Sequence, residues 1–164
     1  MRRVSHYNNY ISQDWQHVGT SVAPEAAARQ LKGDGMQRTA INPWPWSLQV
    51  GYNQAEAVSG HTTQLYCAGQ TAIDADGKPQ FAGDLGSQLG LALDNLQAVL
   101  DGAGMTLANV VRLNIFATDV DAFLAQLGVL HARLQGAAPP GTLLGVARLA
   151  YPELMVEIEA TAVA

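Results

Sequence analysis

Apolar and polar residues alternate regularly near the C-terminal end of the chain, between Val156 and Ala162. The polar members of this alternation are Glu157, Glu159 and Thr161. A period of two is typical of an extended strand, because successive side chains point to opposite faces. The segment therefore predicts a strand whose apolar face lies on a core and whose two carboxylates lie on the opposite face.

The preceding segment, from Thr142 to Leu149, is apolar on both faces of a predicted strand. Strands of this kind are usually buried on both sides. We expect the two segments to pair as a hairpin, closed by a tight turn at residues 150–153. The helices predicted elsewhere in the chain are sufficient for only one face of the sheet, so we expect another subunit to cover the second face.

The rest of the chain predicts further strands and helices. In chain order, these are strands at 52–58 and 62–69, a helix from 85 to about 101, a strand at 110–117 and a helix that ends near 135. Asp84 is expected to cap the first helix, and Asp119 or Asp121 the second, because an aspartate side chain accepts hydrogen bonds from the first backbone N–H groups of a helix. Two helices on one face of a mixed sheet make an α+β domain.

Composition and charge narrow the class of protein. The 164 residues are 48% hydrophobic and carry a net charge of −5, so a basic surface for nucleic acid is not expected. No apolar run approaches the roughly 20 residues that a membrane-spanning helix needs, and no membrane partner is expected. A single cysteine, Cys67, allows no internal disulfide and is compatible with the reducing cytoplasm, where we expect the protein.

Residues 1–35 differ from the rest of the chain, because they are polar and show no convincing amphipathic period. They also lack the apolar middle of a secretory signal. Two interpretations stay open. The segment is either a flexible arm or a non-native leader ahead of a true start at Met36, since residues 32–35 can be encoded by a purine-rich ribosome-binding sequence. We expect the folded domain to span residues 36–164.

Several short motifs, in this order, resemble the RidA/YjgF family. They are Tyr52-Asn53-Gln54, Ala68-Gly69-Gln70, Leu93-Asp94-Asn95-Leu96, and above all Val146-Ala147-Arg148-Leu149 followed by Val156-Glu157-Ile158-Glu159-Ala160. The resemblance implies a chorismate-mutase-like α+β fold and a homotrimer, in which three open sheet faces form a central barrel with pockets at the subunit interfaces. It also implies hydrolysis of small reactive enamines and imines, such as 2-aminoacrylate, without a metal or cofactor.

The resemblance also shows where this chain departs from the family. Deaminating members have an arginine just after a loop proline, which binds the substrate carboxylate through two hydrogen bonds, and Gly141 stands at that position. Ala68 replaces a pocket serine, and Leu127 replaces a pocket asparagine. Arg148 would project from the wrong face of a regular strand, and nothing places Arg112 in the pocket. The missing arginine suggests a less acidic or bulkier substrate than 2-aminoacrylate.

Four candidate positions keep the family pattern: Tyr52, the backbone around Cys67 and Gly69, and Glu157. The family's role for Glu157 is to hold the attacking water, in a pocket where burial would raise its pKa. The alternative is a carboxylate held on the sheet face by a neighbour's backbone. Tyr52 is as compatible with packing as with ligand binding, and Cys67 is more typical of a buried apolar side chain than of a nucleophile. The histidines lack metal-binding spacing.

Two functions therefore follow from the sequence. The first is a trimer that hydrolyses reactive enamine or imine metabolites and so protects against them. The second is a trimer with the same fold that binds a small ligand without chemistry. Some relatives are described as endoribonucleases, but the acidic core domain gives that activity little support.

Overall fold

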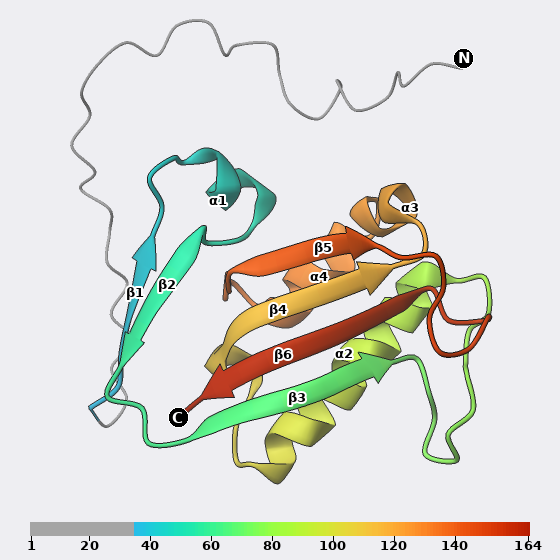
Figure 1. Cartoon of the computed structure of the whole chain (residues 1–164), viewed down its shortest axis with the longest axis horizontal. Coiled ribbons are helices and arrows are strands. Elements are labelled where there is room, and N and C mark those ends of the chain that lie inside the picture. The colour runs from blue at the N-terminus through green and yellow to red at the C-terminus, as the bar shows by residue number, and fades with distance from the viewer. Residues whose placement is uncertain (1–34) are drawn as a thin grey trace, which may run out of the picture.

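A computed structural model of the chain describes residues 35–164, and the expectation for residues 1–34 lies outside this part (Figure 1). Its main body is a four-stranded sheet with the order β3-β6-β4-β5. The strands are β3 (Gln64–Thr71), β4 (Val110–Ala117), β5 (Gly141–Gly145) and β6 (Val156–Val163). The helices are α2 (Leu85–Gly102), α3 (Val120–Leu124) and α4 (Leu127–Leu134). The α+β class predicted from the sequence is confirmed.

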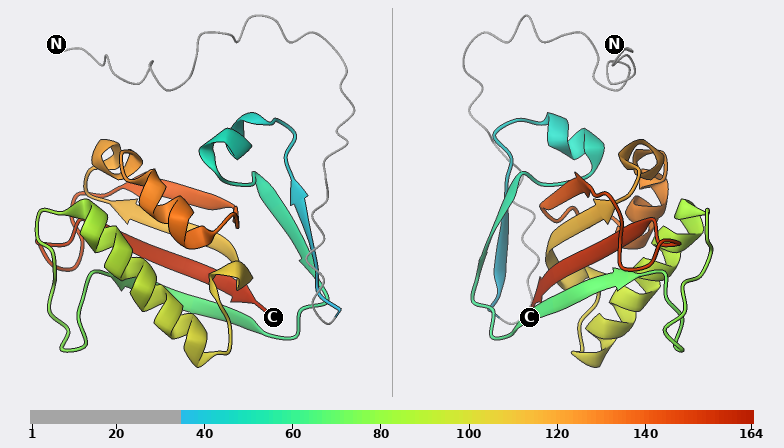
Figure 2. Two further views of the ribbon diagram at one scale, coloured as in Figure 1. Left: turned by 180° about the vertical axis from the view of Figure 1, so that it is seen from behind. Right: turned by 45° about the vertical axis from the view of Figure 1, so that its right-hand side comes forward.

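The helices lie on one face of this sheet, and the other face carries none (Figure 2). Leu89, Leu96 and Leu100 of α2 are completely buried against the apolar side of β6, where Val156 and Ile158 are also inaccessible. Asp84 caps α2 as expected, because its carboxylate accepts a hydrogen bond from the Ser87 backbone N–H at 3.0 Å. The central strand β4 has the predicted bounds.

The second predicted helix is divided into α3 and α4. Asp119, rather than Asp121, caps α3 by accepting a hydrogen bond from the Ala122 backbone N–H at 2.9 Å. The backbone leaves helical geometry at Gln126 and then starts α4. This break lets α3 bury Phe123 and α4 bury Leu130 in the same core, although the two helices have different directions.

The predicted hairpin between the last two strands is wrong. β4 separates them in the sheet, because β5 pairs with β4 in parallel and β6 pairs antiparallel with both β4 and β3. A parallel neighbour is what a helical crossover such as α3–α4 produces. β5 is also shorter than the strand predicted between Thr142 and Leu149. Beyond Gly145 the apolar residues belong to a connection at residues 146–155, where Leu149 and Leu154 are buried against Ala72.

Three elements precede the main sheet. β1 (Gln37–Ile41) and β2 (Ala55–Ser59) form an antiparallel pair, joined through the short helix α1 (Trp46–Val50). The sequence predicted a strand at 52–58 but neither β1 nor α1. The buried position of β1 is Arg38, so hydrophobic periodicity could not reveal this strand.

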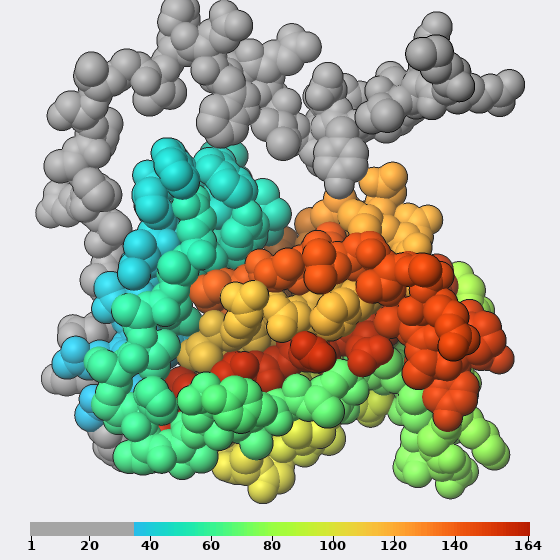
Figure 3. Space-filling model, in the orientation of Figure 1, coloured from blue at the N-terminus to red at the C-terminus, as the bar shows by residue number. Residues whose placement is uncertain are grey.

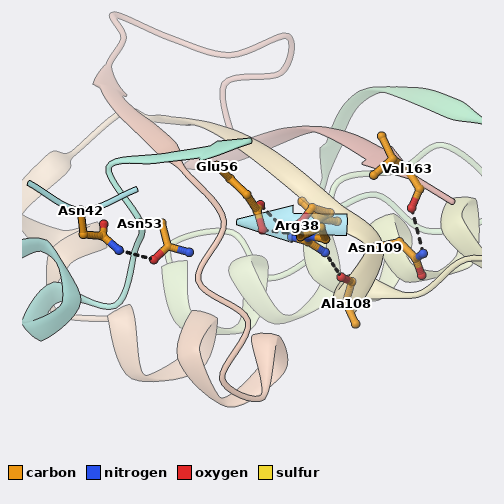
Figure 4. Close-up of polar contacts among 8 residues, drawn as sticks. Arg38, Asn42, Asn53, Glu56, Ala108, Asn109 and Val163 are labelled. Carbon is orange, nitrogen blue, oxygen red and sulfur yellow. Dashed lines mark hydrogen bonds and ion pairs between the residues drawn. The ribbon is translucent and has the colours of Figure 1, made fainter. Parts of the chain in front are cut away.

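Arg38 attaches the β1–β2 pair to the main sheet (Figure 4). Its guanidinium donates to both carboxylate oxygens of Glu56 at 2.8 Å, and both side chains are more than 90% buried. It also donates to the carbonyls of Ala108 at 2.5 Å and Val110 at 2.9 Å, where β4 begins. The two hydrogen bonds to these carbonyls fix the β1–β2 pair at the start of β4, and the two to Glu56 join β1 to β2.

The face of the sheet without helices is open in the single chain (Figure 3). Tyr66 of β3 is 75% exposed and Leu144 of β5 is 49% exposed, although both are large apolar side chains. Cover of this face by another subunit stays a prediction. Within residues 35–164, no helix is long and apolar enough to cross a membrane.

Candidate functional site

Glu157 lies on the helix-free face, as the alternation in the sequence predicts. Its neighbours Val156 and Ile158 are completely buried on the helix side, so the glutamate side chain points the other way. In register, Glu157 pairs with Thr71 on one side and with Phe116 on the other, and Phe116 in turn pairs with Leu144. The carboxylate therefore has an aromatic and an aliphatic neighbour across the sheet.

The Glu157 side chain lies directly over Gly69 of β3. A Cβ atom added at Gly69 would overlap Oε1 of Glu157 and would lie 2.7 Å from its Cδ and 2.9 Å from its Cγ. Gly69 does not have a positive φ, so the glycine is needed for this space and not for its backbone conformation. It lies where the pairing of β3 with β6 shifts register, between Cys67 and Gln70. The strand irregularity and the missing side chain together make room for the carboxylate.

The surroundings of Glu157 favour its protonated form. Burial raises the pKa of Glu157 above its ordinary value, and the negative charge of Glu159 raises it further. Glu159 accepts a hydrogen bond from Nδ2 of Asn114 at 3.4 Å. Among residues 35–164, the ion pairs are Arg38–Glu56 and Arg133–Asp94, and neither involves these two glutamates. A partly buried carboxylate with a raised pKa is suited to exchange a proton with a bound water.

The remaining β3 positions have different surroundings. Cys67 is in the helix-side core, where burial raises the pKa of its thiol. A buried thiol of raised pKa is a poor nucleophile. Ala68 is exposed beside the register shift, and its carbonyl accepts a hydrogen bond from the Gln70 side chain at 3.1 Å. Near Glu157, β3 therefore offers its backbone and the small side chain of Ala68, but not the thiol of Cys67.

Tyr52 and Gly141 lie together, but in another part of the chain. Tyr52 follows α1 and contacts Trp46 edge to face, with ring centroids 6.0 Å apart. The next residue, Asn53, donates its backbone N–H to the carbonyl of Ala138 at 2.9 Å, which places Tyr52 beside the loop that leads to Gly141. Gly141 pairs with Leu113, three positions along β4 from Phe116, which is the partner of Glu157. Within one chain these two positions are not close to Glu157.

Leu127 is the first residue of α4 and packs on the helix-side core, away from the face that carries Glu157. One helical turn later, the ring of His131 contacts Gly51, where an added Cβ would lie 2.9 Å from Cε1 of the ring. No sequence pattern connects His131 with the segment around Tyr52. The contact arises because α4 and the end of α1 pack together.

Arg148 and Arg112 have different surroundings. Arg148 is exposed in the connection after β5, so the sequence argument that assumed a regular strand through this residue does not apply. Arg112 lies on the helix-free face, where it donates a hydrogen bond to Oγ1 of Thr142 at 3.3 Å. It pairs in register with Thr161, whereas Glu157 pairs with Phe116 four positions further along β4. Neither arginine takes the position of Gly141.

Phe116 and Leu144 are site neighbours that sequence reasoning missed. The signal for Phe116 was present, because it shares the parity of Arg112 and Asn114 in β4 and not that of the buried residues.

A hollow of about 410 Å³ also lies at the outer edge of β3, lined in part by Thr71, Asp74 and Asn95. Asn95 donates there to two backbone carbonyls, so its amide is already satisfied.

No group of three histidine, cysteine, aspartate or glutamate side chains in residues 35–164 is arranged to hold a metal ion. The groups that the helix-free face offers to a ligand around Glu157 are the carboxylates, the apolar neighbours of Glu157 and the backbone of β3.

Comparisons with known proteins extend over most of the described chain. The sequence model of the family described as endoribonuclease L-PSP matches residues 47–164. The mitochondrial protein mmf1 of Schizosaccharomyces pombe is 35% identical over 127 residues, which cover 77% of this chain and 75% of mmf1. A 2-iminobutanoate/2-iminopropanoate deaminase of Dermatophagoides farinae is 30% identical over 123 residues, which cover 75% of this chain and 87% of the deaminase.

A solved structure agrees with the sequence comparisons. The crystal structure of YyfB from Yersinia pestis, described as a protein of unknown function of the conserved Rid family, matches with a TM-score of 0.71 and 36% identity. The match covers 77% of this chain and 98% of YyfB. Fold and sequence therefore agree, and the chain belongs to the RidA/YjgF family.

Proposed function

We propose that this protein hydrolyses small imines or enamines, with Glu157 holding the attacking water. The observation that carries the proposal is the position of the Glu157 carboxylate, partly buried over Gly69 on the helix-free face, with a raised pKa. The name of the mite relative, a 2-iminobutanoate/2-iminopropanoate deaminase, supports the reaction class. In the proposed reaction an imine and water give a carbonyl compound and ammonia.

The proposed chemistry needs one group that both accepts and returns a proton. Water attacks the imine carbon, and Glu157 accepts a proton from that water. The same carboxyl group then protonates the nitrogen, which gives a carbinolamine. The remaining hydroxyl proton passes through Glu157 to the nitrogen as the carbon–nitrogen bond breaks, and the carbonyl compound and ammonia leave. General acid–base catalysis is most efficient when the pKa of the group lies near the working pH. Burial and Glu159 both move the pKa of Glu157 in that direction.

The active assembly in this proposal is a homotrimer. Gly141 lies on β5, two strands away from Glu157 and three positions out of its row, and Tyr52 lies beside the loop before Gly141, so a single chain leaves these residues apart. Exposed Tyr66 and Leu144 on the helix-free face also favour contact with another copy. In the proposed trimer, the end of one subunit that carries Tyr52 meets the Glu157 region of the next.

Glu157→Gln tests the role of the carboxylate. We expect kcat/KM for ammonia release from enamines or imines generated in situ to fall about 100-fold or more, because the variant keeps the side-chain shape but cannot accept a proton. Glu153→Gln is the control, since Glu153 is exposed in the connection before β6. Wild-type kcat/KM in Glu157→Gln would show that the carboxylate does not hold the water.

Glu159→Gln tests the origin of the raised pKa. The active form of Glu157 is ionised, so kcat/KM should rise with pH. The apparent pKa of this rising limb of the pH profile should lie above the ordinary glutamate pKa. Removing the charge of Glu159 lowers the pKa of Glu157, and we expect the limb to move to lower pH. Burial remains, so the limb should stay above the ordinary value. A pH profile of kcat/KM measures the shift, and an unchanged limb would contradict this cause.

The second candidate function is binding of a small ligand without turnover. Glycine at position 141, where deaminating relatives are expected to have arginine, favours this candidate. The two functions differ in ammonia release. Saturable ligand binding together with ammonia release no faster than the uncatalysed rate would support binding alone.

A further inference from the structure

The helix-free face around Glu157 combines negative charge with apolar surface. Glu157 and Glu159 are two positions apart on β6 and share this face. Phe116 and Leu144 continue the cross-strand row that contains Glu157. A ligand beside Glu157 therefore meets two carboxylates and two apolar side chains.

Positive charge on this face is distant from Glu157. Among strands β3 to β6, Arg112 is the one residue that is lysine, arginine or histidine. It pairs with Thr161, four positions along β4 from the partner of Glu157. Four strand positions correspond to roughly 13 Å between the two backbones, and the Arg112 guanidinium donates to Thr142 on β5, on the far side of β4 from Glu157. Glu159, two positions from Glu157, lies much closer and raises the pKa of Glu157.

We propose that this site takes imines without a carboxylate group, bound as cationic iminium ions with an apolar substituent. The proposal rests on the imine hydrolysis proposed above. A substrate carboxylate beside Glu157 would face Glu157 and Glu159, whereas Arg112 is directed to Thr142 on β5 and makes no ion pair with either glutamate, and like charges disfavour binding. An iminium N–H group can instead donate to these carboxylates, while the apolar substituent contacts Phe116 and Leu144.

The reaction of such a substrate balances without a further reactant. The iminium R–CH=NH2⁺ and one water give the aldehyde R–CHO and ammonium. The water oxygen bonds to carbon, and the π electrons of the C=N bond move to nitrogen. Glu157 takes a proton from the attacking water and returns it to nitrogen. The C–N bond then breaks as its electron pair moves to nitrogen, and the hydroxyl proton passes through Glu157 to the departing ammonia. The face thus selects the substrate by charge, and Glu157 acts on it.

A matched pair of substrates tests the charge preference. A flavin amine oxidase converts 2-phenylethylamine to its imine, and an L-amino-acid oxidase converts phenylalanine to 2-imino-3-phenylpropanoate. These two imines differ only by the carboxylate. We expect kcat/KM for ammonia release, corrected for uncatalysed hydrolysis, to be at least tenfold higher for the imine of 2-phenylethylamine. A preference for the carboxylated imine would overturn the substrate class and leave imine hydrolysis standing.

Charge variants test whether this face sets the preference. Glu159→Lys should change the ratio of the two kcat/KM values at least tenfold toward the carboxylated imine, and Glu159→Gln should change it in the same direction by less. Asp76→Lys makes the same change in net charge in the exposed loop between β3 and α2, and should leave the ratio unchanged. Equal ratios in Glu159→Gln, Asp76→Lys and the wild type would overturn the proposal, even if Glu159→Lys did not fold.

Equilibrium binding separates failure of this inference from failure of the proposed function. We expect wild-type protein to bind 2-phenylethylammonium at least tenfold more tightly than 3-phenylpropanoate. Hydrolysis of neither imine above background would overturn the proposed reaction, and tighter binding of the ammonium ion would still support the charge preference. Equal binding, or tighter binding of the propanoate, would overturn the charge preference itself.

Discussion

Gly69→Ala is expected to lower kcat/KM for imine hydrolysis about 100-fold while the protein remains folded. The new Cβ would occupy the position of the Glu157 carboxylate, only 2.7 Å from Cδ. Because the obstructing atoms are the end of a flexible side chain, Glu157 can move aside without disturbing the backbone. A displacement of about 1 Å at a reacting group is sufficient for a loss of this size. Ammonia release measures the activity, and circular dichroism and thermal unfolding measure the fold.

Gly90→Ala is the matched control for this substitution. Gly90 lies within α2, and an added Cβ would have no atom within 4 Å. Alanine in a helix is more favourable than glycine by about 0.5–1 kcal/mol, so this variant should be at least as stable as the wild type and equally active. Wild-type kcat/KM in Gly69→Ala would show that the position of the Glu157 carboxylate over Gly69 does not matter for the reaction.

Arg38→Met is expected to reduce the free energy of unfolding by about 3–5 kcal/mol. The substitution leaves the Glu56 carboxylate buried without its partner, and removing one member of a buried ion pair has an effect of this size. It also removes donors to the carbonyls of Ala108 and Val110. Urea unfolding measures the difference, at one fixed protein concentration because oligomers unfold with a concentration-dependent midpoint.

Arg133→Met is the control for Arg38→Met, because it removes an ion pair that is not buried. The Arg133–Asp94 pair is about half exposed, and exposed pairs contribute at most about 1 kcal/mol. The double variant Arg38→Met/Glu56→Leu should recover part of the lost stability, because it removes the uncompensated charge. A destabilisation below 1 kcal/mol in Arg38→Met would mean that the attachment of the β1–β2 pair does not depend on Arg38.

Local signals in the sequence were sufficient for much of the main sheet. The alternation around Glu157 predicted the face on which it lies, and Asp84 identified the start of α2. The pairing of β5 was not accessible in the same way, because Leu149 and Leu154 continue an apolar pattern although they belong to a buried connection. The pairing partner of a strand depends on the chain crossover, which periodicity does not encode.

For the candidate site, too, the sequence was sufficient for some residues and not for the contacts between them. The resemblance selected Glu157 and Gly69, but the reason for the glycine became visible only when β3 and β6 were placed in register. Phe116 had the parity of an open-face residue, yet parity alone does not identify its neighbour across the sheet. Contacts between residues far apart in the sequence required the structure. The position of Tyr52 relative to Glu157 further depends on the assembly of several copies.

Sedimentation equilibrium of the purified protein tests the central claim, which is that sister chains cover the helix-free face and enclose Glu157. Three chains of 17.4 kDa each should sediment together as a particle of about 52 kDa, at the concentrations at which ammonia release is measured. A stable species of 17.4 kDa that retains full activity would contradict it, because the face that carries Glu157 would then be open to solvent.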